Sequence, residues 1–208
     1  FFSSRRRHTR YPLVTGVQTV LFRSGGQILW MKRIGMFLYV PNFLSSGDRQ
    51  FVLDELSRTE TSPENHPLAP GRTMTRIQNG TMTHRIFTSP QVTEWFQKVF
   101  DRRLVSGHDK VPIEYRTYPK GSQGMEWHRD TPLVGNQYEC VYTVKNTSDS
   151  QTLYKDFFGR VHPVWAEPGS LIVVQAGGVR HAVTPVTRGE RSIVKFVLVD
   201  PRDRQPFF

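Results

Sequence analysis

His128 and Asp130 lie two residues apart in the segment GMEWHRDTP, residues 124–132. Side chains two apart on a β-strand point to the same side, so this pair can reach one metal ion. The pair alone is a weak signal, because a chain with seven histidines produces such a match by chance. A third candidate, His181, follows a glycine pair further along the chain. Two imidazoles and one carboxylate form a ligand set that suits Fe(II) and leaves three coordination positions open.

Arg191 lies ten residues after His181, beyond a predicted tight turn with the sequence TRGE. We expect that turn to join two antiparallel strands, which would bring Arg191 and His181 to the same end of a strand pair. A buried arginine is costly unless an anion meets it, and a guanidinium pairs with a carboxylate through two parallel hydrogen bonds. A dicarboxylate that chelates the metal with one end and binds Arg191 with the other satisfies both requirements. Strand alternation places three further residues on the face of Arg191: Ile193, Lys195 and Val197.

The elements that precede this constellation are predicted to be mainly helical. Residues 36–56 predict a strand, a turn and a helix. Ser45, followed by Asp48 three residues later, resembles a capping box ahead of an amphipathic run. A second helix is expected from Pro90 to about Leu104, because proline is favoured at the first helical position.

Residues 73–87 contain Asn79-Gly80 between two threonine-rich segments. Both residues of such a turn accept positive φ, so we expect a β-hairpin here. Two interpretations of this hairpin stay open: a mobile lid whose basic side chains contact substrate, or an added hairpin that extends the sheet. Residues 59–71 are polar and proline-rich and predict a loop.

From Val111 onward the sequence changes to short β-branched and aromatic segments. Glycine, proline, asparagine and aspartate separate them, which is typical of an all-β sandwich or barrel. Six segments carry this pattern: VPIEYRTYP, QYECVYTVKN, GRVHPVWAE, GSLIVVQAG, HAVTPV and ERSIVKFVLV.

The net charge of +10 is unevenly distributed along the chain. Residues 1–24 carry five arginines and no acidic residue, which accounts for half of the excess. This segment shows no helical or strand period. It resembles the translated read-through of a sequencing adaptor, with a transit peptide as the alternative. We therefore expect residues 1–30 to be a non-native or disordered extension, and the charge is discounted as a sign of nucleic-acid binding.

Residues 31–208 predict a single domain, with neither a linker nor a repeat inside it. Within this domain we expect helical and hairpin support over residues 31–110 and a β core over residues 111–200. No apolar run reaches membrane-spanning length. Cys140 is the only cysteine, so no internal disulfide can form. We expect a soluble protein with no membrane partner, and an intracellular location is favoured.

Three segments together resemble the Fe(II)- and 2-oxoglutarate-dependent oxygenases, most closely the prolyl-4-hydroxylase-like branch. They are YPKGSQGMEWHRDT, EPGSLIVV and HAVTPVTRGERSIVKFVLV. The resemblance covers about residues 111–200. It implies a mainly β fold with flanking helices around a double-stranded β-helix, the jelly-roll or cupin-like core. It also implies a dioxygenase that hydroxylates an unactivated C–H bond and releases succinate and CO2. The implied substrate is a prolyl or other residue in a peptide, or a free amino acid.

The resemblance also implies a role for each candidate residue. His128, Asp130 and His181 would bind Fe(II), and Arg191 would bind the far carboxylate of the cosubstrate 2-oxoglutarate. O2 is the second cosubstrate, and ascorbate would act as a supporting reductant. Tyr118 matches a position where related enzymes often place a tyrosine near the cosubstrate. Tyr142 would either line the same pocket as a cofactor-binding residue or pack in the barrel core, and both interpretations stay open.

Two departures bear on the branch and the substrate. Collagen-type prolyl 4-hydroxylases usually carry lysine where Arg191 lies. Relatives that repair nucleic acids carry a second arginine six residues further on, where this chain has Val197. Two rival functions stay open: an oxygenase that acts on nucleic acid, and a non-catalytic jelly-roll module that binds neither iron nor 2-oxoglutarate. The oligomeric state is not predicted.

Overall fold

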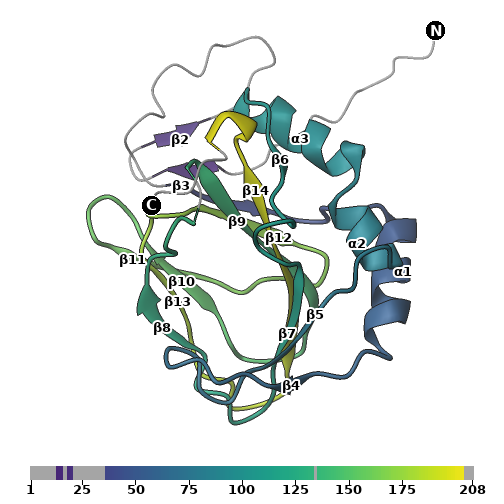
Figure 1. The fold of residues 1–208 in the computed structure, drawn as a ribbon. Helices are drawn as coiled ribbons and strands as arrows, with labels where there is room; N and C mark the ends of the chain where they lie inside the picture. The colour runs from purple at the N-terminus through teal and green to yellow at the C-terminus, as the bar shows by residue number, and fades with distance from the viewer. Residues whose placement is uncertain (1–12, 16–17, 21–35, 134, 204–208) are drawn as a thin grey trace, which may run out of the picture.

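The computed structural model describes residues 13–15, 18–20, 36–133 and 135–203. These residues form two antiparallel sheets that face each other, with helices on the outer side of the larger sheet (Figure 1). The larger sheet has ten strands in the order β2-β1-β3-β12-β9-β14-β7-β5-β4, with β6 also paired to β14. Its strands are β1 Leu13–Thr15, β2 Gln18–Val20, β3 Met36–Val40, β4 Ser62–Pro63, β5 Thr73–Arg76, β6 Val105–Ser106, β7 Glu114–Tyr118, β9 Gln137–Asn146, β12 Leu171–Gln175 and β14 Arg191–Val199.

The smaller sheet has four strands in the order β11-β10-β13-β8. These strands are β8 Met125–His128, β10 Thr152–Lys155, β11 Val161–Val164 and β13 His181–Val183. From β7 to β14 the chain passes repeatedly from one sheet to the other, so the two sheets wind together. This is a double-stranded β-helix, and it confirms the fold class predicted from the sequence.

The same winding corrects the expected pairing of the last two strands. β13 pairs with β8 and β10 in the smaller sheet, whereas β14 pairs with β7 and β9 in the larger one. The TRGE turn therefore crosses between sheets instead of closing a hairpin. Gly189 in that turn has a φ of 67°, and a Cβ there would lie 2.3 Å from the carbonyl oxygen of Thr147. Only glycine fits such a close backbone approach at positive φ.

Two helices predicted from the sequence are confirmed. Helix α1 spans Ser46–Leu56, and Ser45 caps it by accepting a hydrogen bond from the backbone N–H of Asp48 at 3.1 Å. Helix α3 spans Pro90–Phe100 and ends before the expected Leu104. Its final residue is followed by Asp101 in the left-handed conformation, at a φ of 49°, which terminates the helix.

The hairpin expected over residues 73–87 is wrong in its second half. Strand β5 is followed by Gly80 at a φ of 87°, but Asn79 does not have the positive φ that the predicted turn needs, and the chain then enters helix α2, Met82–Phe87. Thr81 explains the difference, because its hydroxyl accepts a hydrogen bond from the N–H of His84 at 3.3 Å. The threonine therefore acts as a helix N-cap and not as a strand residue.

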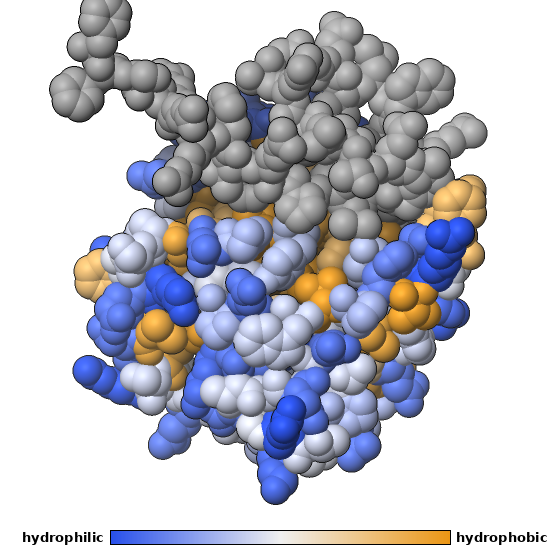
Figure 2. Space-filling view, turned by 180° about the vertical axis from the view of Figure 1, so that it is seen from behind, coloured by the Kyte–Doolittle hydropathy of each residue, from blue (hydrophilic) through white to orange (hydrophobic). Residues whose placement is uncertain are grey.

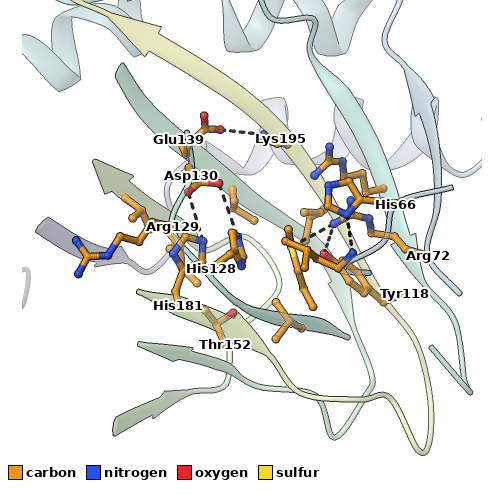
Figure 3. Close-up of a pocket in the computed structure, with 18 of the residues that line it drawn as sticks. His66, Arg72, Tyr118, His128, Arg129, Asp130, Glu139, Thr152, His181 and Lys195 are labelled. Atoms are coloured by element: carbon orange, nitrogen blue, oxygen red, sulfur yellow. Dashed lines mark hydrogen bonds and ion pairs between the residues drawn. The ribbon is translucent and has the colours of Figure 1, made fainter. Parts of the chain in front are cut away.

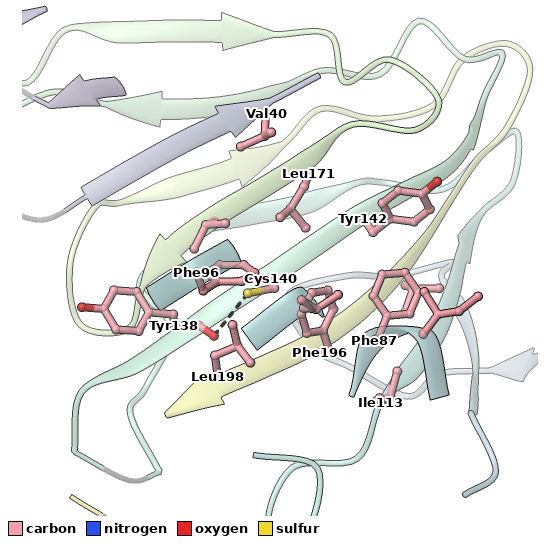
Figure 4. Packing of buried hydrophobic residues seen from close by; sticks show 14 of the residues in the cluster. Val40, Phe87, Phe96, Ile113, Tyr138, Cys140, Tyr142, Leu171, Phe196 and Leu198 are labelled. Atoms are coloured by element: carbon pink, nitrogen blue, oxygen red, sulfur yellow. Dashed lines mark hydrogen bonds between the residues drawn. The ribbon is translucent and has the colours of Figure 1, made fainter. Parts of the chain in front are cut away.

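The main core lies between the three helices and the outer face of the larger sheet (Figure 4). Phe87 from α2 packs against Phe196 of β14 and Tyr142 of β9, with ring centroids 4.9 and 5.3 Å away. Phe96 from α3 is fully buried in the same cluster. The helices thus hold β9 and β14 from behind and leave the opposite faces of these strands free for the interior of the jelly roll.

The exposed surface in Figure 2 shows hydrophobic patches scattered among hydrophilic side chains. In the part of the chain that the structure describes, no helix is long and apolar enough to cross a membrane. Most of residues 1–30 lie outside the described residues. Strands β1 and β2 fall within that segment, although its sequence predicted no strand, and β1 pairs with β3 at the edge of the larger sheet.

Candidate active site

A cavity of about 240 Å³ lies inside the jelly roll, between the inner faces of the two sheets (Figure 3). His128, His181 and Arg191 lie at ends of strands that line this cavity, and Asp130 lies two residues beyond the end of β8. The cavity is lined by His128, Asp130, His181 and Arg191, and by aliphatic side chains that include Val141, Ile172, Val174, Val183 and Ile193. The sequence prediction that these four polar residues share one site is therefore consistent with their placement.

His128, Asp130 and His181 each offer one ligand atom within 4.8 Å of the others. The two histidines are direct cross-strand partners on β8 and β13, and their ring centroids are 4.2 Å apart. Nε2 of His128 lies 3.7 Å from one carboxylate oxygen of Asp130, and Nε2 of His181 lies 3.3 Å from the other. Pairing in register thus brings together two residues that are far apart in the sequence.

The hydrogen bonds of the two rings define which nitrogen is free for a metal. Nδ1 of His128 lies 2.7 Å from the carbonyl oxygen of Glu126, and Nδ1 of His181 lies 3.1 Å from that of Val179. A carbonyl oxygen only accepts, so Nδ1 carries the proton in each neutral ring, and the Nε2 lone pair faces Asp130. Burial, together with the neighbouring His181, lowers the pKa of His128 and favours its neutral form. Neutral imidazoles with their Nδ1 protons bound to carbonyls are the arrangement of histidine metal ligands.

Arg191 lies in the wall of the same cavity with its side chain fully buried. Among the described residues, its Nε and Nη1 atoms have no hydrogen-bond partner. Burial lowers the pKa of this guanidinium, and the neighbouring Tyr118 only partly offsets the effect. The hydroxyl of Thr152, which also lines the cavity, is likewise buried and without a partner among the described residues. A buried guanidinium and a buried hydroxyl without partners fit an anion with several acceptor oxygens.

Tyr118 of β7 is the cross-strand partner of Arg191 and lines the cavity. Its hydroxyl accepts a hydrogen bond from Nη1 of Arg72 at 2.9 Å. The other side of the Arg72 guanidinium binds both carboxylate oxygens of Glu64, at 2.6 and 2.7 Å. Arg72, which is fully buried and bound in a bidentate pair to the half-buried Glu64, therefore fixes the tyrosine from the cavity wall.

Glu139 and Lys195 form an ion pair on the cavity wall, with Nζ and Oε2 3.0 Å apart. Gln137 donates a hydrogen bond to the other oxygen of Glu139. Burial raises the pKa of Glu139, Lys195 offsets this only in part, and the nearby charge of Asp130 raises it further. Strand alternation had placed Lys195 on the face of Arg191, but no role was inferred for it, and Glu139 was missed.

Two interpretations that stayed open in the sequence concern residues near this cavity. Tyr142 lies in the main core on the helix-facing side of β9, whereas Glu139 and Val141 of that strand line the cavity. The open choice between pocket and core is therefore resolved in favour of the core. His66, Leu68 and Arg72, from the segment before β5, line the cavity. None of its lining residues comes from residues 73–87, the segment with the two open interpretations of lid and added hairpin. No sequence pattern predicted a role for Arg72, because its contact with Tyr118 joins residues 46 positions apart.

No protein-family model and no curated protein sequence matches the chain. Solved structures match it over most of its length. A prolyl-4-hydroxylase from Pseudomonas putida is 18% identical with a TM-score of 0.62, covering 77% of this chain and 91% of that one. HygX from Streptomyces hygroscopicus, solved with nickel and 2-oxoglutarate bound, is 12% identical with a TM-score of 0.61, covering 79% and 83%.

A third match is a prolyl hydroxylase from Trichoplax adhaerens, solved with a peptide fragment of the hypoxia inducible factor oxygen degradation domain. It is 15% identical with a TM-score of 0.62, and the alignment covers 81% of this chain and 85% of that one. At identities this low, the structural similarity establishes the fold alone. The chain accordingly has the jelly-roll fold of the 2-oxoglutarate- and Fe(II)-dependent oxygenases, the prolyl hydroxylases among them.

Proposed function

We propose that the protein is an Fe(II)- and 2-oxoglutarate-dependent dioxygenase that hydroxylates a C–H bond of an amino-acid substrate. In the balanced reaction, one atom of O2 enters the C–H bond to give the alcohol. The other enters the cosubstrate, which leaves as succinate and CO2. One observation carries the proposal: a His-Asp-His cluster with its Nε2 atoms free and a buried arginine without partners line one cavity.

His128, Asp130 and His181 would hold the metal as a facial triad. When bound, Fe(II) would supply the activation of O2, and the protein would supply geometry and exclusion of water. Asp130 acts as a ligand in this proposal and not as a general base. The Glu126 and Val179 carbonyls keep both imidazoles in the tautomer that a metal requires.

Arg191 would bind the far carboxylate of 2-oxoglutarate, because it is the buried cation in this cavity that lacks an acidic partner. Thr152 would donate its hydroxyl to the same carboxylate. Tyr118, held by Arg72, would line the cosubstrate and present its phenol at a fixed angle. The aliphatic walls keep water away from this end of the cavity, which strengthens the charge pairing.

Turnover of 2-oxoglutarate to succinate tests the proposal. Purified protein is incubated with Fe(II), ascorbate, 2-oxoglutarate and a mixture of amino acids and prolyl peptides, and succinate is quantified. We expect Fe(II)-dependent succinate formation that falls at least 100-fold in His181→Ala. His162→Ala is the matched control, since that imidazole is bound to Asp156 outside the cavity and its loss leaves activity intact. Equal activity in both variants, or none in the wild type, would contradict the proposal.

A further inference from the structure

The Glu139–Lys195 ion pair lines the same cavity as Arg191, with Lys195 further along strand β14. Arg191 and Lys195 occupy the same face of β14 four residues apart, so their Cα atoms are about 13 Å apart at about 3.3 Å per residue. Figure 3 shows Glu139 next to Asp130, with the two imidazoles and then Thr152 on the far side. A cosubstrate bound between Arg191 and the triad therefore leaves this ion pair facing the rest of the cavity.

The ion pair is not explained by stability. Its neighbours on the two cavity-facing strands are Val141 and Ile193, both aliphatic. Replacing a buried ion pair with well-packed apolar side chains is often neutral or stabilising, because both charges lose their hydration. Glu139 is only 4% exposed, so it bears most of this cost. A pair retained at such a cost, in a cavity proposed to hold a substrate, indicates recognition of a charged ligand.

Lys195 keeps hydrogen-bonding capacity for that ligand. Its ammonium group has three N–H donors, and the one contact among the described residues is with Glu139. Its side chain is 20% exposed and lines the cavity. The ammonium can therefore bind a second carboxylate without releasing the first.

The charge balance restricts what can bind. The metal that Asp130 would bind offsets its charge, which leaves Glu139 and Lys195 as a balanced pair on this wall. A simple anion would compete with Glu139 for Lys195, and a simple cation would compete with Lys195 for Glu139. A zwitterion adds no net charge, and it matches the ion pair with one group of each sign. The cavity of about 240 Å³ is also smaller than the roughly 300–1,000 Å³ of typical drug-sized ligand sites.

We propose that Lys195 binds the carboxylate and Glu139 the ammonium group of a free α-amino acid, which is the primary substrate. This inference rests on the proposed function, since it names the substrate class of the same site. A residue inside a peptide carries amides in place of both charges, so it would make no use of the ion pair. The pair thus selects the free amino acid over the peptide.

Calorimetric titration without O2 tests this inference. The protein is loaded with Fe(II) and 2-oxoglutarate and titrated with each standard L-amino acid. The N-acetylated, C-amidated forms and a prolyl peptide are titrated in parallel. We expect at least one free amino acid to bind and its blocked form to bind at least 30-fold more weakly. We expect Lys195→Met to lower the affinity for the free amino acid by at least 30-fold. A loss of this size is typical when one partner of a buried charge pair is removed.

The double variant Lys195→Met/Glu139→Leu guards against misfolding, because it leaves no unpaired charge. We expect it to retain cosubstrate binding and to lose discrimination between free and blocked amino acids. If the wild type fails to bind 2-oxoglutarate at all, the proposed function itself is wrong. If it binds 2-oxoglutarate but takes no free amino acid, or binds the blocked form or the peptide as tightly, only the zwitterion inference is overturned.

Discussion

The two faces of β14 have opposite compositions. On the helix side, Val194, Phe196 and Leu198 are buried in the main core with aromatic and aliphatic neighbours. On the cavity side, Arg191 and Lys195 are cationic. Ile193, which lies between them on that face, is aliphatic. Strand β9 repeats the division, with its core face apolar and Glu139 on its cavity face.

The two faces of one strand therefore have different roles: one stabilises the fold and the other forms the ligand site. The core face lowers the free energy of the folded state by removing apolar area from water. The cavity face raises it, because buried charges and unpartnered donors lose hydration. The apolar face therefore supports a ligand site that would not be stable alone. Substitutions on one face should change stability, and those on the other should change ligand binding.

Phe196→Ala tests the core face and should have the largest effect. The ring is fully buried against Phe87, so its removal should cost about 3–5 kcal/mol of unfolding free energy, including the cavity left behind. Phe51→Ala is the control, because that ring is 52% exposed and its loss should cost less than about 0.5 kcal/mol. Urea unfolding measures both. A similar loss of unfolding free energy in both variants would contradict the burial of Phe196 in the main core.

Arg191→Met tests the cavity face. We expect the stability of the apo-protein to stay equal or rise, since a desolvated guanidinium without a partner is removed. The affinity for 2-oxoglutarate should fall at least 100-fold. Arg188→Met is the matched control, because that arginine is exposed. A strong loss of stability with unchanged cosubstrate affinity would show that Arg191 is structural.

Glu64→Gln tests the ion pair between Arg72 and Glu64, which holds Tyr118 in the cavity wall. Arg72 would lose its charged partner while remaining buried, so we expect a loss of about 1.5–3 kcal/mol at pH 7. Burial alone would raise the pKa of Glu64, but its hydrogen bonds with Arg72 and the charge of Arg116 outweigh this and lower it. A lowered carboxyl pKa contributes stability above its unfolded value of about 4.3, and that contribution is lost as the pH falls further.

The difference in stability between wild type and Glu64→Gln should therefore shrink as the pH is lowered from 7 towards 3. Denaturant midpoints at several pH values measure it. Glu60→Gln, at an exposed carboxylate in the same part of the chain, serves as the control. A gap that stays constant with pH would contradict the sign of the pKa shift.

The two tyrosines give the smallest and sharpest contrast. Tyr118→Phe removes a hydroxyl that lines the cavity, and we expect cosubstrate affinity to fall by about 3–10-fold, the value of one hydrogen bond. Tyr142→Phe should change it less than 2-fold, because that ring packs in the main core. Burial raises the pKa of Tyr142 to about 12, so its phenol stays neutral there. The reverse ranking would reinstate Tyr142 as a pocket residue.

Local chemistry explains which parts could be predicted from the sequence. The helix caps, the β character beyond Val111 and the pairing of His128 with Asp130 all depend on residues a few positions apart. The hairpin over residues 73–87 failed because Thr81 fits both a strand and a helix cap. Only tertiary packing decides between the two.

Long-range features were harder to predict. The jelly roll sends β13 and β14 to different sheets, which a turn sequence does not reveal. Arg72 and Thr152 enter the site from segments remote from the triad, so no local spacing connects them to it. Lys195 was on the correct face by alternation, but its partner Glu139 on β9 becomes visible only once the strands are paired.

Anaerobic titration of the apo-protein with Fe(II) and then 2-oxoglutarate tests the central claim most directly. The triad and Arg191 should together produce the visible charge-transfer band of a metal-chelated 2-oxo acid. We expect this band in the wild type, at far higher 2-oxoglutarate in Arg191→Met, and not at all in His181→Ala. Absence of the band from folded wild-type protein would contradict the account and favour a non-catalytic jelly-roll module.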